Sequence, residues 1–188
     1  MIVRMAGVIL IAAWALAGGV APDQDRSTEE PESYRTGNYR APTPETLRGA
    51  RVIATSEAEA IWRAGSAEFV DVMPHVPHPA ELPAGTLWRG QRRLNIPGSI
   101  WLPDTGYGEP SAAEQDYLRS GLQRVTRGNR SMPLVIYCQR HCWMSWNAAK
   151  RAASWGYTAV IWYPDGTDGW QDAGLPLAEA TPAAHPGE

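Results

Sequence analysis

The chain contains two cysteines, Cys138 and Cys142, and both lie in one short segment of its 188 residues. Two cysteines this close together cannot staple a chain of this length, so they do not form a disulfide framework. As a thiolate, a cysteine is a nucleophile, and two thiols separated by one turn of chain also lie within disulfide reach. The pair therefore indicates a site for sulfur chemistry.

The residues on either side of the pair predict how it is held. Residues 133–137 form a compact apolar run of strand type, and residues 143–155 are rich in Ala and end at Gly156, as a helix does. A strand, a tight loop and a helix N-terminus point backbone N–H groups into the loop. These groups would stabilise a thiolate on Cys138. The alternatives are an inert buried cysteine or a structural disulfide.

Short apolar strands alternate with helices along the chain. Strands are expected at 51–54, 68–73, 96–102, 133–137 and 159–162, and helices at 55–65, 111–126 and 143–155. Ser111 with Glu114 forms a capping box at the start of the second helix. The alternation predicts an α/β fold with a five-stranded, mostly parallel sheet and helices on both faces.

Composition limits the classes of partner. Hydrophobic residues make up 44% of the chain, and the formal net charge is -3 from 17 basic and 20 acidic residues. The chain has no basic excess that would favour nucleic acid, so we expect no nucleic-acid partner. Its length predicts one domain with a sizeable core.

The first residues have the pattern of a secretory signal peptide. A short basic stretch at 1–4 precedes an apolar stretch at 8–16 and small residues at 17–21. A retained membrane anchor is the alternative, since the uncharged run approaches the length of a membrane span. Either way the rest of the chain faces an oxidising compartment. We predict cleavage, a periplasmic protein, and no stable membrane insertion afterwards.

The domain boundaries follow from these segments. Residues 1–21 are the signal peptide, and 22–45 are a polar linker and irregular lead-in rich in Pro, Glu, Ser and Thr. Residues 46–178 form the folded domain, and residues 179–188 form a disordered tail. Within the lead-in, Tyr34 and Tyr39 are candidates for pinning it to the domain surface.

Several motifs, taken in order, resemble the rhodanese-like domain family over about residues 47–178. The segment 69–72 is similar to its Asp-containing strand, 96–100 to its proline-glycine segment, and 135–138 to the strand before its catalytic cysteine. Residues 156–176 are similar to its closing pattern. The resemblance implies a rhodanese-like fold, Cys138 as the catalytic cysteine, and sulfurtransferase activity.

The cysteine loop departs from the family pattern. No glycine lies between Cys138 and Ser145, and Trp143 stands where an arginine is expected. Cys142 is an addition inside the loop. An arginine at that position would help to bind thiosulfate, so the departure argues against thiosulfate as the donor.

Two segments are similar to a narrower bacterial subgroup. Residues 142–150, Cys-Trp-Met-Ser-Trp-Asn-Ala-Ala-Lys, and residues 39–44, Tyr-Arg-Ala-Pro-Thr-Pro, resemble members with a CXXCW motif associated with PQQ-dependent alcohol catabolism. This resemblance implies a periplasmic protein that works near quinoprotein dehydrogenases and cytochrome c.

The favoured interpretation is a sulfurtransferase or persulfide carrier. Cys138 would attack a sulfur donor and hold a persulfide, and Cys142 would resolve it, releasing reduced sulfur and leaving a disulfide. The expected partner is a small sulfur donor or a thiol acceptor. No cofactor or metal is expected. The candidate substrate-binding residues in the loop are Gln139, Arg140, His141 and Trp143.

Three alternative functions stay open. The pair could cycle between dithiol and disulfide as a redox protein. With His141 and Met144, it offers soft ligands suited to copper(I). The domain could also be a non-catalytic binding module.

Overall fold

The computed structural model describes residues 29–76, 81–83, 85–87 and 92–185. The predicted signal peptide at 1–21, the first residues of the linker and the last three of the tail lie outside this range. Among the helices of the described ranges, none is long and apolar enough to cross a membrane.

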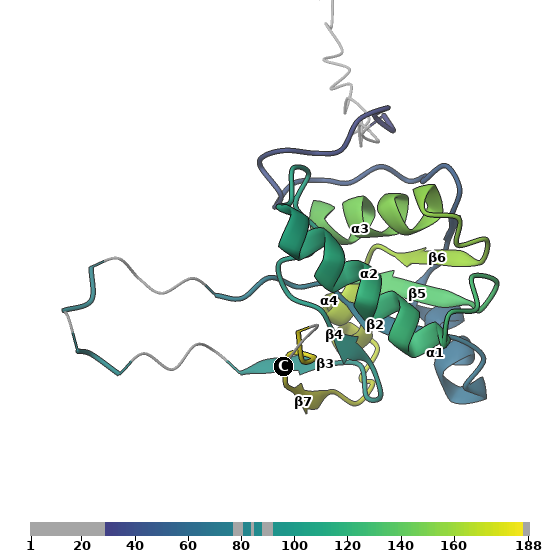
Figure 1. Ribbon diagram of the computed structural model, residues 1–188. Coiled ribbons are helices and arrows are strands. Elements are labelled where there is room, and N and C mark those ends of the chain that lie inside the picture. The colour runs from purple at the N-terminus through teal and green to yellow at the C-terminus, as the bar shows by residue number, and fades with distance from the viewer. Residues whose placement is uncertain (1–28, 77–80, 84, 88–91, 186–188) are drawn as a thin grey trace, which may run out of the picture.

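A five-stranded sheet with strand order β1-β6-β5-β2-β4 forms the centre of the fold (Figure 1). The strands are β1 (Arg51–Val52), β2 (Glu68–Asp71), β4 (Ile100–Trp101), β5 (Leu134–Tyr137) and β6 (Val160–Tyr163). Every pairing between them is parallel, and all residues of β5 and β6 are buried. Continuous apolar strands of this kind need cover on both faces. The predicted sheet is confirmed.

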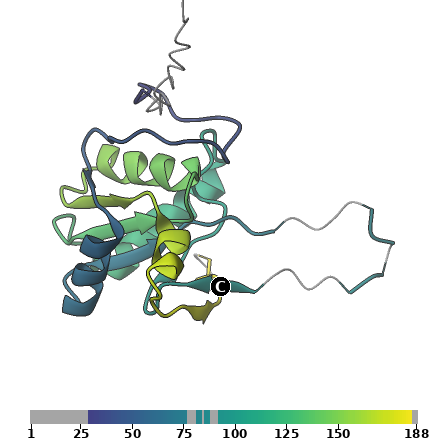
Figure 2. The same ribbon diagram turned by 180° about the vertical axis from the view of Figure 1, so that it is seen from behind.

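Two layers of helix supply that cover (Figures 1 and 2). Helices α2 (Ala112–Thr126) and α3 (Trp143–Ser154) share a buried cluster with β5 residues Leu134 and Ile136. Helices α1 (Thr55–Ala64) and α4 (Gly166–Asp172) share another with Val135 and Tyr137. Alternate residues of one strand therefore serve the two layers, as strand geometry requires. Helices on both faces are also confirmed.

The helix starts agree in part with the sequence. The capping box of Ser111 and Glu114 is present in both directions. Helix α1 instead follows Ala54 and has no side-chain cap. The hydroxyl of Thr55, the first residue of α1, shares a hydrogen bond with that of Tyr163, 2.9 Å away, so it makes a tertiary contact instead of a cap.

Three elements have no counterpart in the predicted set: α4, β3 (Arg93–Asn95) and β7 (Ala178–Ala180). Helix α4 contains glycines, which disfavour a helix, but a Cβ at Gly169 would come within 3.0 Å of the Tyr163 hydroxyl. Packing therefore requires glycine there. Strands β3 and β7 form a separate antiparallel pair that joins distant parts of the chain.

The structure corrects the predicted disordered tail. The last two residues of β7 lie inside it, and the Ala183 N–H donates to the Trp101 carbonyl at 2.9 Å. The Tyr117 hydroxyl donates to the Ala183 carbonyl at 2.6 Å. Main-chain bonds and this tyrosine hold the segment on the domain, although its composition lacks large apolar residues.

Candidate functional site

The two cysteines lie at the carboxyl edge of the sheet, as the sequence predicted. Cys138 directly follows β5, Cys142 is the N-cap residue of α3, and the two are joined by a disulfide. Their Cα atoms are 6.5 Å apart, and the chain turns between them through His141 at a φ of 55°. Cys138 is 0% exposed and Cys142 is 2% exposed. The site is therefore a closed, oxidised loop.

The surroundings of the Cys138 sulfur differ from the expected ring of amide donors. Its Sγ atom lies 3.6 Å from the Cys142 carbonyl oxygen and 3.7 Å from that of Gln139. Two loop amides are directed to protein acceptors. The Arg140 N–H donates to Asp168 at 3.3 Å, and the Trp143 N–H donates to the Tyr39 carbonyl at 2.9 Å. In the oxidised state these two amides are engaged elsewhere than at the sulfur.

Arg140 is engaged by helix α4. Its guanidinium donates to Asp172 at 2.8 Å and to Asp165 at 3.5 Å. The hydrogen bond to Asp172 raises the pKa of the Arg140 guanidinium, so this group stays charged. The other cationic candidate of the loop, His141, is exposed. Arg140, a predicted substrate-binding residue, is therefore directed to carboxylates of α4 and its N-cap.

A different arginine contacts the cysteine segment. The carbonyl of Cys138 accepts a bond of 3.2 Å from Arg93 Nη2, and bonds of 3.1 Å from both the N–H and the hydroxyl of Thr167. Arg93 also donates through Nε to the fully buried Asp71 at 2.7 Å. Burial raises the pKa of Asp71, and the charge of Arg93 opposes that rise.

Arg93 and Thr167 were missed as site residues. Asp71 was part of the strand motif at 69–72, and in the sheet it pairs with Tyr137, the residue before Cys138. The pairing of these two strands was the signal that could have placed Asp71 near the cysteine loop. Arg93 lies on β3, outside the main sheet, and no local pattern connects it to the loop.

The described part of the lead-in, residues 29–45, lies along α3 and is here called the strap (Figure 1). Arg40 of the strap pairs with Cys142 in an antiparallel bridge. Trp143 is 1% exposed, and its Nε1 donates to the Pro42 carbonyl at 3.1 Å. The guanidinium of Arg35 lies 5.1 Å from the Trp143 ring centroid. The predicted binding residue Trp143 is therefore covered by the strap.

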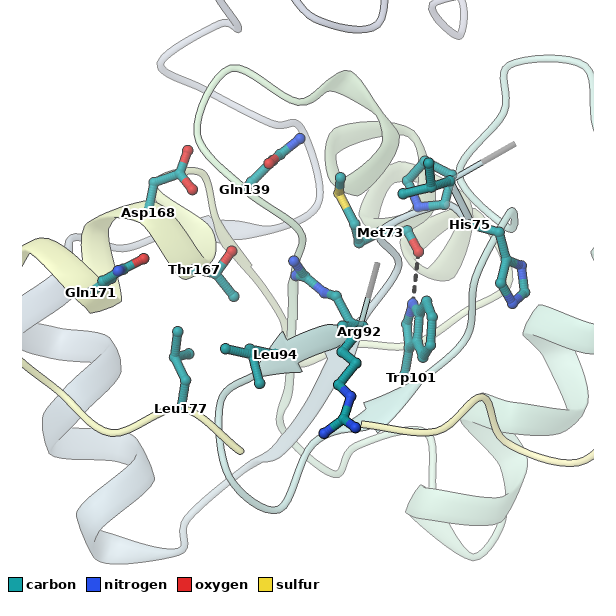
Figure 3. A pocket seen from close by; sticks show the side chains of 13 residues that line it. Met73, His75, Arg92, Leu94, Trp101, Gln139, Thr167, Asp168, Gln171 and Leu177 are labelled. Atoms are coloured by element: carbon teal, nitrogen blue, oxygen red, sulfur yellow. Dashed lines mark hydrogen bonds between the residues drawn. The ribbon is translucent and has the colours of Figure 1, made fainter. Parts of the chain in front are cut away.

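A pocket of about 320 Å³ opens beside the other end of the loop (Figure 3). Its polar lining includes Gln139, Thr167 and Asp168, and Figure 3 shows these on one side with Trp101 on the other. Of the four predicted binding residues, Gln139 lines this pocket. Neither cysteine belongs to its lining, so the disulfide and the pocket are separate in this state. The full lining is Met73, Pro74, His75, Val76, Arg92, Arg93, Leu94, Trp101, Gln139, Thr167, Asp168, Gln171 and Leu177.

The described residues contain no group of three or more His, Cys, Asp or Glu that could hold a metal ion. The soft ligands considered for copper are differently disposed. Met144 is 1% exposed, whereas His141 is exposed, and the two cysteine sulfurs are bonded to each other.

A parallel sheet with a cysteine loop between its central strand and the next helix defines an α/β protein with a paired-cysteine site. The family model of the rhodanese-like domain matches residues 55–173, and the chain belongs to this family. A comparison with curated proteins gives no significant match.

One solved structure supports the fold, and two others are similar at lower TM-scores. A thiosulfate sulfurtransferase from Pseudomonas aeruginosa aligns with a TM-score of 0.51 and 17% identity, over 75% of this chain and 22% of that one. The chain thus spans less than a quarter of that protein. The polysulfide-sulfur transferase homodimer of Wolinella succinogenes gives a TM-score of 0.42 at 14% identity, over 73% of this chain and 84% of that one. The human single-domain sulfurtransferase TSTD1 gives a TM-score of 0.39 at 22% identity, over 65% of this chain and 96% of that one.

Proposed function

We propose that this rhodanese-like protein handles reduced sulfur through Cys138 and Cys142, as a sulfurtransferase or persulfide carrier. One observation carries the proposal. Cys138 follows the central strand β5 in a domain of the rhodanese-like family, and Cys142 stands close enough to form a disulfide with it. A cysteine that accepts sulfur and a second that resolves it need this spacing.

The chemistry starts from the reduced pair. The Cys138 thiolate attacks the terminal sulfur of a persulfide donor, and the donor leaves as a thiolate. The sulfur is then held as a persulfide on Cys138. The Cys142 thiolate attacks Cys138 Sγ, expels hydrosulfide and leaves the Cys138–Cys142 disulfide. A dithiol reductant takes up that disulfide and restores both thiols. The oxidised loop of the structure corresponds to the last intermediate of this cycle.

Access to the sulfurs involves the strap. Both sulfurs are buried, and Arg40 runs beside Cys142. A small donor or acceptor therefore reaches them when the strap or the loop opens. Closed around a persulfide, the same segment would protect it from water and other thiols.

The test uses the variant Cys142→Ser. After reduction and exposure to glutathione persulfide, intact mass should show one added sulfur atom on Cys138, because attack occurs but resolution does not. The wild-type protein should end as the disulfide and release hydrogen sulfide. Cys138→Ser should do neither. Absence of both added sulfur and hydrogen sulfide would contradict the proposal.

A second candidate function is thiol–disulfide exchange without sulfur transfer. The disulfide between Cys138 and Cys142 favours it. In this case both cysteines are needed, the pair exchanges with a dithiol buffer, and hydrogen sulfide is not released. The same experiment separates the two functions.

We further propose a periplasmic location and a role beside PQQ-dependent alcohol oxidation. The support is the signal-peptide pattern at 1–21 and the subgroup motif at 142–150. A periplasmic quinoprotein dehydrogenase or cytochrome c is then the expected neighbour. N-terminal sequencing of protein from the periplasmic fraction tests the location. Met1 retained on a membrane-bound protein would reject it.

A further inference from the structure

The proposed cycle places negative charge on Cys138 twice, first as the thiolate and then as the persulfide. A buried sulfur is a poor place for such charge unless a cation or donor lies nearby. The Sγ atom faces the carbonyls of Gln139 and Cys142, which do not favour an anion. Arg140 is held by Asp165 and Asp172. The source of favourable charge therefore lies outside the loop.

We infer that Arg93 is the positioning residue of the cysteine loop: it fixes the Cys138 carbonyl and sets positive charge beside Cys138 in its anionic states. This inference rests on the proposed function for its purpose, since only a reacting cysteine needs that charge. The guanidinium reaches from β3 to the Cys138 carbonyl at 3.2 Å, and its side chain is 13% exposed. At such low exposure, solvent screens its charge weakly.

Asp71 holds this arginine in place. Its Oδ2 accepts from Arg93 Nε at 2.7 Å, while its Oδ1 accepts the N–H of Met73 at 2.9 Å. The guanidinium is therefore clamped between the carboxylate of β2 and the carbonyl after β5. The negative charge of Asp71 offsets the cost of burying the Arg93 cation. It also cancels part of the electrostatic field of Arg93, so the effect on Cys138 is moderate.

Thr167 provides a neutral comparison at the same carbonyl. It donates both its N–H and its hydroxyl to the Cys138 oxygen at 3.1 Å. A loss of the hydroxyl weakens the positioning without removing charge. Other ionisable groups around the loop, among the described residues, include Arg35, Tyr39 and Arg40 of the strap, Tyr137 of β5, Arg140, His141 and Cys142 of the loop, and Asp165, Asp168 and Asp172 at α4.

The experiment titrates Cys138 in the full chain with Cys142→Ser as background. Isotope-labelled cysteine then gives one Cβ resonance, whose shift follows thiolate formation. Arg93→Gln should raise the midpoint of the Cys138 titration by about one pH unit, because the thiolate loses its nearby cation. Arg93→Lys should return most of that shift, since the charge is kept. Thr167→Val should move the midpoint much less than Arg93→Gln.

Three results would overturn the inference: no shift in Arg93→Gln, an equal shift in Thr167→Val, or a shift in Arg93→Lys as large as in Arg93→Gln. If Arg93→Gln does not fold because Asp71 is left unpaired, the double variant Asp71→Asn with Arg93→Gln replaces it. That variant should shift in the same direction by less, and an unchanged or lowered midpoint would reject the role. Failure of persulfide formation in the same background would reject the proposed function instead, and leaves the titration interpretable.

Discussion

Asn147 is one of several α3 side chains that bind the strap, and its removal gives the sharpest test of the strap. The residue is 0% exposed. Its Oδ1 accepts from the Arg35 N–H at 3.0 Å, and its Nδ2 donates to the carbonyls of Arg35 and Gly106, each at 2.9 Å. Three neutral bonds at about 1 kcal/mol each predict that Asn147→Ala lowers the unfolding free energy by about 3 kcal/mol. A domain of ordinary stability would survive this loss.

The assay for Asn147→Ala is urea unfolding of the oxidised protein, followed by tryptophan fluorescence. A second measurement, the rate of disulfide reduction by a dithiol, should increase because a loosened strap uncovers Cys142. Lys150→Ala is the matched control on the same helix. It removes one bond of 3.1 Å to the Pro31 carbonyl and the contact with the Trp146 ring. Lys150→Ala should lower the unfolding free energy by less than about 1 kcal/mol. A loss of similar size in both variants, or an unchanged reduction rate in Asn147→Ala, would refute the reasoning.

Three further predictions concern the loop itself. Reduction of the Cys138–Cys142 disulfide should lower the unfolding free energy by only about 2 kcal/mol, because the closed loop is short. Calorimetry of the oxidised and reduced proteins measures this difference, and a loss twice as large would contradict the prediction. Arg140→Ala should cost less than about 1 kcal/mol and leave the Cys138 titration unmoved, since its ion pairs with α4 are partly exposed. Gly166→Ala should lower the unfolding free energy, measured in urea, by about 2 kcal/mol or more. Gly166 has a φ of 51°, and an added Cβ would lie 2.6 Å from the Cys138 carbonyl oxygen. A neutral effect would show that the turn relaxes.

The sequence predicted the parts of this fold whose signals are local. The run 133–137 is apolar throughout, and a strand buried on both faces requires that composition. Ser111 and Glu114 stand at capping-box spacing, so that helix start was also readable. The position of Cys138 followed from these rules, because a residue after a parallel strand lies at the carboxyl edge of the sheet.

The contacts that surround Cys138 could not be predicted in the same way. Arg93 is separated from Cys138 by 45 positions, and it lies on a short strand whose sequence gives no strand pattern. The loop arginine at 140 was the natural candidate from sequence alone. Its binding to Asp172 depends on α4, a helix whose glycines conceal it from propensity rules. The strap was classed as linker because its composition is polar, yet its backbone supplies the bonds to α3.

The two ends of the cysteine loop are held unequally, and this asymmetry determines how the disulfide can open. At Cys138 the backbone carbonyl is fixed by three donors, one of them charged. At the other end, the restraints come from the irregular strap: the bridge of Arg40 with Cys142, and the bonds from Trp143 to the Tyr39 and Pro42 carbonyls. When the sulfurs separate, the end with the weaker restraint is the one that moves. We therefore expect Cys138, the proposed sulfur acceptor, to stay fixed, and Cys142 to move with the strap. Because the first turn of α3 follows Cys142, we expect the strap contact at Tyr39 to influence both the exposure of the cysteine pair and the proposed attack of Cys142 on Cys138.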